Sequence, residues 1–262
     1  MTNTPRQEGR PEGERIAKLL ARAGVASRRE VERMIADGRV AIRGKVLDTP
    51  ATIIPNLHGV TVDDKPVGKP EPTRLFAFHK PSGLLTAERD FSGKATIYDA
   101  LRNALPADTP RIMPVGRLDL NTEGLLLLTN DGGLKRQMEL PSTGITRSYR
   151  ARTFGDVTQQ MLESLMDGIE VDGIRYGPID ANLEARTKNA SGSNQWIEVR
   201  ITEGKNREVR RVLEHLGLKV SRLIRTAYGP FELGELGRGQ AVEVRKGDLG
   251  RFQSDLKRGG RA

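Results

Sequence analysis

The sequence predicts an α+β protein with two domains, a small helix-and-hairpin domain followed by a larger domain organised around a buried β-strand. Residues 68–73 read GKPEPT, and a stretch with two prolines and no aliphatic or aromatic residue is typical of a linker. Apolar residues recur at helical spacing before this linker. After it, the unbroken apolar run Leu125–Leu128 indicates a strand buried on both faces. The predicted domains are therefore residues 14–72 and 74–250.

The composition favours a soluble protein with a polyanionic partner. The chain has 262 residues, enough for one large and one small domain, and 36% of them are hydrophobic. Its formal net charge of +9 and its pI near 10.0 point to nucleic acid as the first candidate partner. A merely basic soluble protein would carry the same charge, so charge alone leaves that alternative open.

Cysteine and histidine usage argues against disulfide and metal chemistry. The chain has no cysteine, and its histidines (His58, His79 and His215) are scattered without the spacing of metal ligands. We therefore expect no metal and no cofactor. The apolar stretches are too short to span a membrane, and the first residues lack the apolar core of a signal peptide. The expectation is a cytoplasmic monomer without a membrane partner.

The first domain is expected to contain two helices and a hairpin. Residues 1–13 are polar, with four prolines and glycines, and we predict a disordered basic arm. Apolar spacing predicts a helix over residues 16–23 and a second one after Ser27, where Glu30 completes a capping-box pattern. Residues 40–42 and 46–47 are predicted to be the strands of a hairpin, and residues 60–62 a further strand.

The first half of the larger domain reads as strands joined by loops and turns. Residues 75–78 predict a strand, residues 79–83 a turn and residues 97–101 a short helix. Residues 125–128 are the buried strand, and the following Asn-Asp-Gly-Gly at 130–133 has the chemistry of a turn.

The second half of this domain alternates strands and helices. Residues 146–152 alternate as on a strand with an exposed face, and residues 157–166 predict a helix. The polar segment 187–194 predicts a hairpin loop before a strand over 196–201. A helix with its apolar face at 209–216 and a basic strand at 219–225 follow. Residues 251–262 are predicted to be a frayed basic tail.

The first domain carries a concentration of positive charge. Between residues 14 and 47, nine basic residues face four acidic ones. Arginines on a rigid helical face can grip phosphates, although a solvated helical face would have the same composition. The candidate RNA-binding residues are Arg15, Arg28, Arg29, Arg33, Arg43 and Lys45.

A candidate reactive group lies just before the buried strand. Asp119 is two residues from Arg117, in a loop that starts at Gly116 and leads into the apolar strand. Loops carried by a rigid strand are common places for reactive groups. The alternative is that Asp119 caps a turn and Arg117 is solvated, which would be usual for an aspartate in a loop.

Residues 19–47, LLARAGVASRREVERMIADGRVAIRGKVL, resemble the S4 RNA-binding domain. This resemblance implies binding to structured RNA through its backbone and shape rather than through base sequence.

Residues 116–131, GRLDLNTEGLLLLTND, resemble the central motif of the pseudouridine synthases. The similarity is greatest to the branch that modifies ribosomal RNA and carries an S4 domain, and closer to its large-subunit members. It implies a mixed, largely antiparallel catalytic sheet. In that family the aspartate at the position of Asp119 is the catalytic carboxylate, and the residue at the position of Arg117 serves as a wedge or clamp.

Three further segments resemble other motifs of the same family. The KPSG turn resembles the first motif of the family, which is usually regarded as structural, and for its Lys80 we expect either a contact with phosphate or a solvated turn lysine. The resemblance of residues 147–149 implies that Tyr149 stacks on the target uracil beside basic Arg147. In ITEGKNREVRRVLEHLG, it implies that an arginine reaches the catalytic carboxylate, with Arg210 as first choice and Arg207 as second.

The predicted function is isomerisation of a uridine in ribosomal RNA to pseudouridine, without a cofactor. One alternative is a non-catalytic S4-type RNA-binding or ribosome-assembly factor, which would have no need of Asp119 beside a tyrosine and arginines. A glycosidic-bond hydrolase is a weaker alternative, because that chemistry usually needs two facing carboxylates.

Overall fold

The computed structural model describes residues 13–88, 90, 93–185 and 194–259. The predicted arm of residues 1–13 and the predicted loop of residues 187–194 therefore lie, apart from one residue each, outside the described part of the chain. The chain divides into two compact units, residues 1–73 and 74–262. The division coincides with the end of the proline-rich stretch 68–73.

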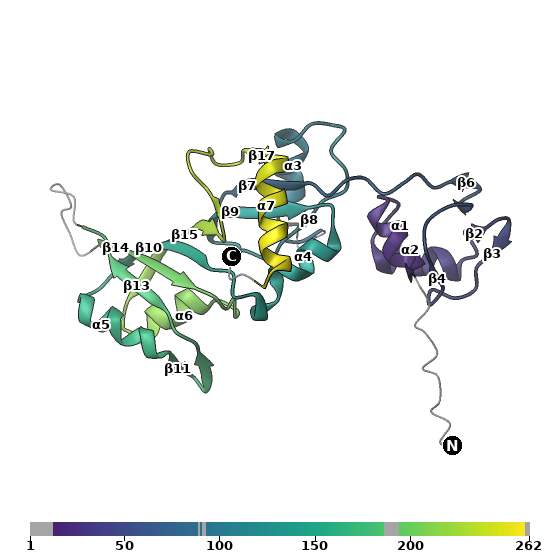
Figure 1. Ribbon diagram of the computed structural model, residues 1–262. Helices are drawn as coiled ribbons and strands as arrows, with labels where there is room; N and C mark the ends of the chain where they lie inside the picture. Colours follow the sequence, from purple (N-terminus) through teal and green to yellow (C-terminus); the bar gives the residue numbers. More distant parts are fainter. Residues whose placement is uncertain (1–12, 89, 91–92, 186–193, 260–262) are drawn as a thin grey trace, which may run out of the picture. The chain divides into compact units, whose positions relative to one another are not determined.

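The first unit contains the helices and the hairpin that its apolar pattern predicts (Figure 1). Helix α2 begins after Ser27, whose Oγ accepts a hydrogen bond from the Glu30 backbone N–H at 3.2 Å. A core of aliphatic side chains, including Ile16, Leu20 and Val31, joins the helices to the sheet. The elements are α1 (Ile16–Arg22), α2 (Arg28–Ala36), a sheet of β3 (Lys45–Val46), β2 (Val40–Ile42), β5 (Val60–Val62) and β6 (Lys65–Pro66), and the pair β1 (Glu14–Arg15) and β4 (Ile53–Ile54).

The second unit is built on a nine-stranded sheet (Figure 1). Its strands pair antiparallel except for β9 and β15, which are parallel, so the sheet is mixed and largely antiparallel. The order is β13 (Asp180–Leu183), β14 (Asn194–Ile201), β10 (Arg147–Phe154), β15 (Lys219–Tyr228), β9 (Thr122–Thr129), β7 (Leu75–Lys80) and β17 (Ala241–Glu243). Two short strands, β8 (Met113–Pro114) and β16 (Phe231–Glu232), pair with β9 and β15.

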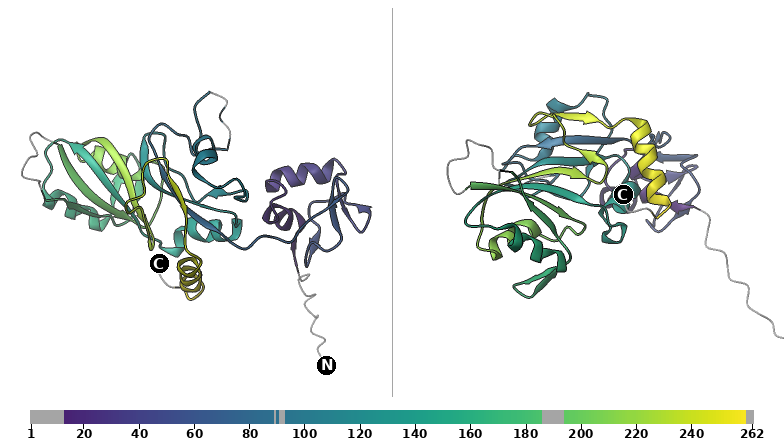
Figure 2. Two further views of the ribbon diagram at one scale, coloured as in Figure 1. Left: turned by 90° about the horizontal axis from the view of Figure 1, so that it is seen from above. Right: turned by 60° about the vertical axis from the view of Figure 1, so that its left-hand side comes forward.

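The apolar run of β9 is buried on both faces, as predicted. Leu126 and Leu128 pack into one core cluster, whereas Leu125 and Leu127 pack into another. Figure 2 shows helices on both sides of this sheet. The first cluster is covered by α3 (Ile97–Ala104), α5 (Gln159–Glu163) and α6 (Glu208–His215), and the second by α4 (Gly132–Glu139) and α7 (Lys246–Lys257).

The remaining described elements of this unit are short and lie between the main strands. They are the 3-10 turns η1 (Pro141–Thr143) and η2 (Ser164–Asp167) and the hairpin of β11 (Ile169–Val171) and β12 (Ile174–Tyr176). The predicted helix 157–166 is therefore shorter than expected, since its α-helical part begins at Gln159 and its end is a 3-10 turn.

Two other predictions were wrong. Residues 130–133 are not a turn, because Asp131 accepts hydrogen bonds from the next backbone N–H groups and caps α4. The predicted frayed tail is largely α7, which extends to Lys257 and buries Phe252. Strand β10 does alternate as predicted, with Arg147 and Tyr149 buried on one face and Arg152 and Phe154 exposed on the other.

A β-bulge in β15 determines which of its side chains lie on the same face of the sheet. Ser148 pairs with Ala227, but Tyr149 pairs with Arg225, so Thr226 is an extra residue on β15. The extra residue shifts the alternation of the strand. Arg225 and Tyr228 consequently lie on the same face of the sheet, although they are three positions apart and would face opposite sides of a regular strand.

Candidate active site

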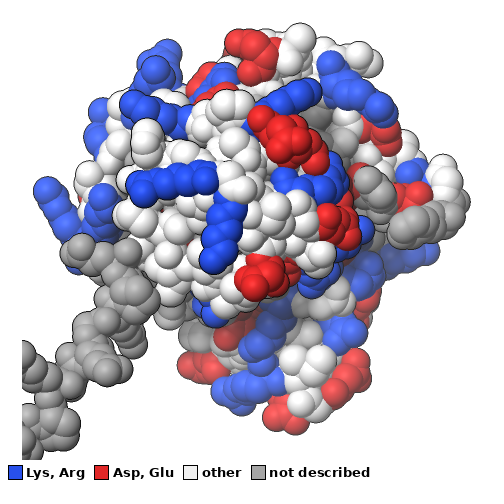
Figure 3. Space-filling view, turned by 90° about the vertical axis from the view of Figure 1, so that its right-hand side faces the viewer, with Lys and Arg blue, Asp and Glu red and all other residues white. Residues whose placement is uncertain are grey.

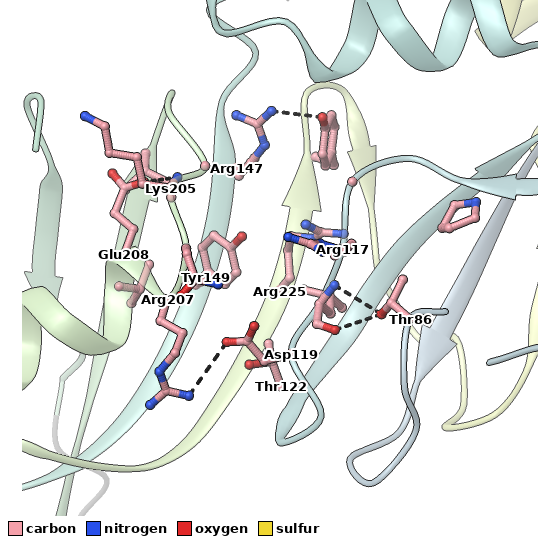
Figure 4. Close-up of a pocket in the computed structure, with 18 of the residues that line it drawn as sticks. Thr86, Arg117, Asp119, Thr122, Arg147, Tyr149, Lys205, Arg207, Glu208 and Arg225 are labelled. Carbon is pink, nitrogen blue, oxygen red and sulfur yellow. Dashed lines mark hydrogen bonds and ion pairs between the residues drawn. The ribbon is translucent and has the colours of Figure 1, made fainter. Parts of the chain in front are cut away.

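A cavity of about 1100 Å³ opens over this face of the sheet (Figure 4). Its walls come from the loop that precedes β9, from β10 and β15, and from the turn that leads into α6. The cavity contains Asp119, Arg117 and Tyr149, three residues that the sequence marked as candidates. The cavity thus brings together the loop of Asp119, strand β10 about 30 residues later and the turn before α6 about 90 residues later.

Asp119 is carried by a loop that is fixed from several sides. Its side chain is 36% exposed. Thr86 holds the loop at Leu118, whose N–H donates to Thr86 Oγ1 at 3.3 Å and whose carbonyl accepts from it at 2.7 Å. On the other side, Glu139 accepts a hydrogen bond from the Gly116 N–H at 2.6 Å. The carboxylate therefore meets the cavity from a constrained backbone.

Lys80 is neither a phosphate contact nor a solvated turn lysine, so both sequence-based expectations for it were wrong. It is fully buried, with 0% of the residue exposed. Its Nζ donates to the carbonyls of Asp119 at 3.1 Å, Leu120 at 3.3 Å, Thr122 at 2.9 Å and Pro81 at 3.1 Å. An ammonium has three N–H groups, so these four acceptors saturate it. Lys80 ties both ends of the loop that presents Asp119.

We expect kcat to fall as the pH rises through about 8. Burial lowers the pKa of Lys80 from 10.5 to about 8, although nearby Asp119 and Glu123 act in the opposite direction. Above that pH the neutral amine has only two N–H groups and turns a lone pair towards carbonyl oxygens, which loosens the loop.

The same titration should not lower the melting temperature. In the unfolded chain the lysine keeps its proton up to about pH 10.5, so between pH 8 and 10.5 the unfolded state binds more protons through this group. Stability contributed by Lys80 therefore does not decline with pH in that window. Turnover and thermal unfolding measured between pH 7 and 9.5 check the prediction, and a flat kcat would contradict it.

The ion-pair partner of Asp119 is Arg207 rather than Arg210. Arg207 Nη1 lies 4.0 Å from Asp119 Oδ2, and the two side chains point towards each other in Figure 4. Arg207 is the N-cap of α6 and has a left-handed backbone, with φ of 53°. A non-glycine residue in this region is strained, and such strain often accompanies function.

Arg210 supports the site from behind. It is buried, and its Nη2 donates to the carbonyl of Asn121 at 2.9 Å while Nη1 donates to Val220 at 3.3 Å. It thus connects α6 to β15 and to the residue two positions after Asp119. Its predicted catalytic role rests on the family resemblance and remains a prediction.

Tyr149 lies in the cavity with the basic Arg147 and the aromatic Tyr228. Arg147, which precedes it on the same face, donates to the carbonyls of Thr202 and Glu203 and to the hydroxyl of Tyr228. Arg147 therefore fixes the turn that leads to Arg207, so its hydrogen bonds are largely used within the protein. Tyr149 and the exposed Arg117 are the residues best placed to meet a ligand.

Several residues of the site could not be found from sequence patterns. Thr86 comes from an unremarkable loop, and Tyr228 reaches the cavity only because of the bulge in β15. Glu208 is buried in the wall, where burial raises the pKa of its carboxyl group and the Lys205 N–H donates to it at 2.9 Å. Arg225 is also buried there.

The candidate RNA-binding residues of the first unit are all exposed. Figure 3 shows basic side chains standing out from the surface of the molecule, with acidic ones among them. Arg33 forms a surface ion pair with Glu30, which stabilises little and leaves the arginine available. The set comprises Arg15, Arg28, Arg29, Arg33, Arg43 and Lys45.

The described residues offer neither a metal-binding cluster nor a helix that could span a membrane. No group of three or more His, Asp or Glu side chains within the described ranges is arranged to hold a metal ion. No helix in that part of the chain is both long and apolar enough to cross a membrane.

Family models match most of both units. The model described as RNA pseudouridylate synthase matches residues 74–215, and the S4 domain model matches residues 14–55. Among solved structures, a crystal structure of a pseudouridylate synthase is similar over 94% of this chain and 99% of its own, with a TM-score of 0.59 and 24% identity. This last similarity concerns the fold.

Curated relatives agree with the family models. A chain named as an uncharacterized RNA pseudouridine synthase from Rickettsia bellii is 42% identical, over 89% of this chain and 97% of its own. The ribosomal large subunit pseudouridine synthase B of Haemophilus influenzae is 41% identical, over 85% of this chain and 62% of its own. Its counterpart in Pseudomonas aeruginosa is 38% identical, over 93% of this chain and 63% of its own.

Proposed function

Because the chain belongs to the RNA pseudouridylate synthase family, we propose that it isomerises a uridine of large-subunit ribosomal RNA to pseudouridine, with Asp119 as the catalytic carboxylate. The observation that carries the proposal is the convergence of Asp119, Arg207 and Tyr149 on one cavity. Relatives named as acting on the large subunit support the choice of RNA. This chain spans less than two thirds of their length.

The reaction rearranges bonds within one nucleotide and exchanges only protons with solvent. The glycosidic bond between N1 and C1′ breaks, and the uracil leaves with the electron pair. After the base turns, C5 forms a new bond to C1′. The proton of C5 is lost to solvent and N1 gains one, so atoms and electrons balance. The charged groups described above suffice for these steps, and we propose no cofactor.

Each residue of the cavity has a distinct part in this scheme. The target base must leave its stack, and the exposed Arg117 is suited to fill the gap or clamp the RNA. Tyr149 offers an aromatic face to the extruded uracil. Asp119 acts at C1′, either as a nucleophile or as a stabiliser of developing positive charge. Arg207 pairs with the carboxylate of Asp119 and aims it.

The S4 unit accounts for capture of the substrate. Its exposed arginines suit the phosphates of folded RNA, and we propose a cytoplasmic enzyme that works as a monomer on structured ribosomal RNA. A non-catalytic RNA-binding factor built on the same domain would gain nothing from the clamped loop, the strained Arg207 or the buried Lys80.

Release of tritium from RNA labelled at C5 of uridine tests the proposed function. The purified protein should release tritium from a large-subunit ribosomal RNA transcript and stop at one equivalent per modified site. Nearest-neighbour analysis of the product should identify pseudouridine. Binding without tritium release from any ribosomal transcript would favour the non-catalytic alternative.

Replacing Arg28, Arg29 and Arg33 with alanine should weaken binding to every structured RNA by a similar factor. These exposed residues form the first turns of α2, where backbone N–H groups also favour anions. Each lost phosphate contact should remove roughly 0.7–0.9 from the slope of log K against log salt. Turnover of bound substrate should barely change, because Asp119 belongs to the other unit.

Titrations of wild type and the triple variant at several salt concentrations, on one ribosomal RNA fragment, check this expectation. The matched control replaces three exposed basic residues of α7, Lys246, Arg251 and Lys257, with alanine. An unchanged affinity and salt slope in the α2 variant would mean that its arginines only solvate the helix.

A further inference from the structure

Two buried polar atoms in the active-site cavity have no hydrogen-bond partner within the described part of the chain. They are Nη2 of Arg225 and Oγ1 of Thr122. Both residues line the cavity, and each is only 2% exposed. An unpaired buried polar group is costly, and such groups usually have an explanation in strain or function.

The fold places these two side chains on the face of the sheet that forms the floor of the cavity. Arg225 pairs with Tyr149 on one side and with Gly124 on the other, and Thr122 pairs with the neighbouring Leu223. The backbone N–H of Thr122 also donates to the Asp119 carbonyl at 3.0 Å, so the hydroxyl lies close to the carboxylate loop. Figure 4 shows Thr122 beside Asp119 and Arg225 nearby.

Arg225 is held in a fixed orientation and keeps one unused hydrogen-bond donor. Its Nε donates to the Leu125 carbonyl at 2.7 Å, and its guanidinium lies 5.2 Å from the centre of the Tyr228 ring. These contacts fix the orientation of the group while Nη2 stays unused. No carboxylate pairs with it among the described residues, so its charge is also not neutralised locally.

We propose that Arg225 and Thr122 recognise the imide edge of the extruded uracil and thereby select uridine over cytidine. Arg225 donates to a ring carbonyl oxygen, and Thr122 Oγ1 accepts the N3–H. At the position of O4, cytosine presents an amino group that cannot accept a hydrogen bond from Arg225. Its N3 also has no proton for Thr122 Oγ1 to accept, so the hydroxyl would have to turn and donate instead. This inference rests on the proposed function, because it assigns the substrate base of the same cavity.

The imide edge also suits the turn that the base must make. Rotation of uracil by 180° about the axis through N3 and C6 exchanges N1 with C5 and O2 with O4. The N3–H stays in place, and a carbonyl oxygen returns to each flanking position. Thr122 and Arg225 can therefore hold the base before and after rotation with the same hydrogen bonds.

A base fits this floor better than a phosphate, which would offer the same oxygen acceptors. Moving a phosphate to a buried position costs more than moving a neutral carbonyl, and pairing with Arg225 would offset only part of that cost. The two atoms lie below the cavity surface, so a ligand must displace a covering side chain to reach them. Arg117 is an exposed lining residue and can move aside.

The test compares affinities in an Asp119→Asn background, in which the target uridine should remain unmodified during binding. The probe is a large-subunit RNA fragment that wild-type protein modifies, and its copy with cytidine at that position. The parent should bind the uridine fragment at least about tenfold more tightly. Adding Thr122→Val or Arg225→Lys should reduce this ratio about tenfold, since the first removes the hydroxyl acceptor and the second removes the fixed Nη2 donor.

Thr109→Val is the matched control, because Thr109 Oγ1 is also buried without a partner among the described residues but lies outside the cavity. Its ratio should equal that of the parent. An unchanged ratio in both cavity variants overturns the inference, and if both RNAs also bind more weakly by the same factor, the two residues contact phosphate instead. A melting temperature of Thr122→Val well below that of Thr109→Val also overturns it, because the hydroxyl would then have a partner within the protein. Failure of wild type to release tritium would instead contradict the proposed function.

Discussion

Replacing Asp119 with asparagine should lower the rate of pseudouridine formation by about 10³-fold or more while RNA binding stays within a few-fold of wild type. Asparagine keeps the size and polarity of the side chain but removes the charge that the chemistry at C1′ needs. The ion pair with Arg207 is 4.0 Å long and partly exposed, so its loss should hardly affect stability. Single-turnover tritium release and an RNA titration measure the two effects separately.

Asp255→Asn is the control for this substitution, because Asp255 is an exposed residue of α7 and does not line the cavity. It should leave both rate and affinity unchanged. Activity of Asp119→Asn close to that of wild type would remove the catalytic assignment. A large loss of RNA affinity or of melting temperature would show instead that Asp119 serves binding or folding.

Gly124→Ala should destabilise the second unit by roughly 4 kcal/mol or more, which is a large part of the stability of an ordinary domain. A Cβ at this position would lie 2.2 Å from the carbonyl oxygen of Arg225 and 2.6 Å from its nitrogen. The backbone φ of +104° is a further cost for any residue other than glycine. Strands β9 and β15 must separate to make room, and they carry Thr122 and Arg225.

Gly173→Ala separates the two causes, because Gly173 also has a positive φ, of +74°, but a Cβ there would meet nothing within 4 Å. It should cost only about 1–2 kcal/mol. Thermal unfolding of both variants, with limited proteolysis to identify the unit that opens, measures the difference. Equal melting temperatures for the two variants would contradict the account of close strand approach.

Local patterns predicted the parts of this protein that depend on neighbouring residues. The Ser27 cap, the hairpin of the first unit and the strand Leu125–Leu128 follow from spacing and side-chain type. Asp119 and Tyr149 were found because long motifs carry them, and the cavity brings them together. The catalytic role of each remains a prediction.

Other features depend on contacts that sequence spacing does not contain. Lys80 looked like a turn lysine, but its four acceptors come partly from a loop 40 residues later. Arg207, and not the predicted Arg210, pairs with Asp119. The left-handed backbone at the start of α6 turns Arg207 towards the carboxylate. An Asn-Asp-Gly-Gly turn and a helix N-cap share the same residue types, so Asp131 was ambiguous.

The sequence of helix α7 does carry the apolar spacing of a helix, although a frayed tail was predicted there. Leu249, Phe252 and Leu256 follow the spacing of a helical face, and the first two are buried. The predicted frayed tail rested on the basic residues between them, and such residues are equally compatible with the exposed face of a helix.

The most direct test of the proposed function is a pseudouridine map of large-subunit ribosomal RNA from cells that lack this protein. We expect the loss of a specific pseudouridine, its return with the wild-type chain and its continued absence with Asp119→Asn. Retention of every pseudouridine in the deletion strain, or restoration by Asp119→Asn, would contradict it.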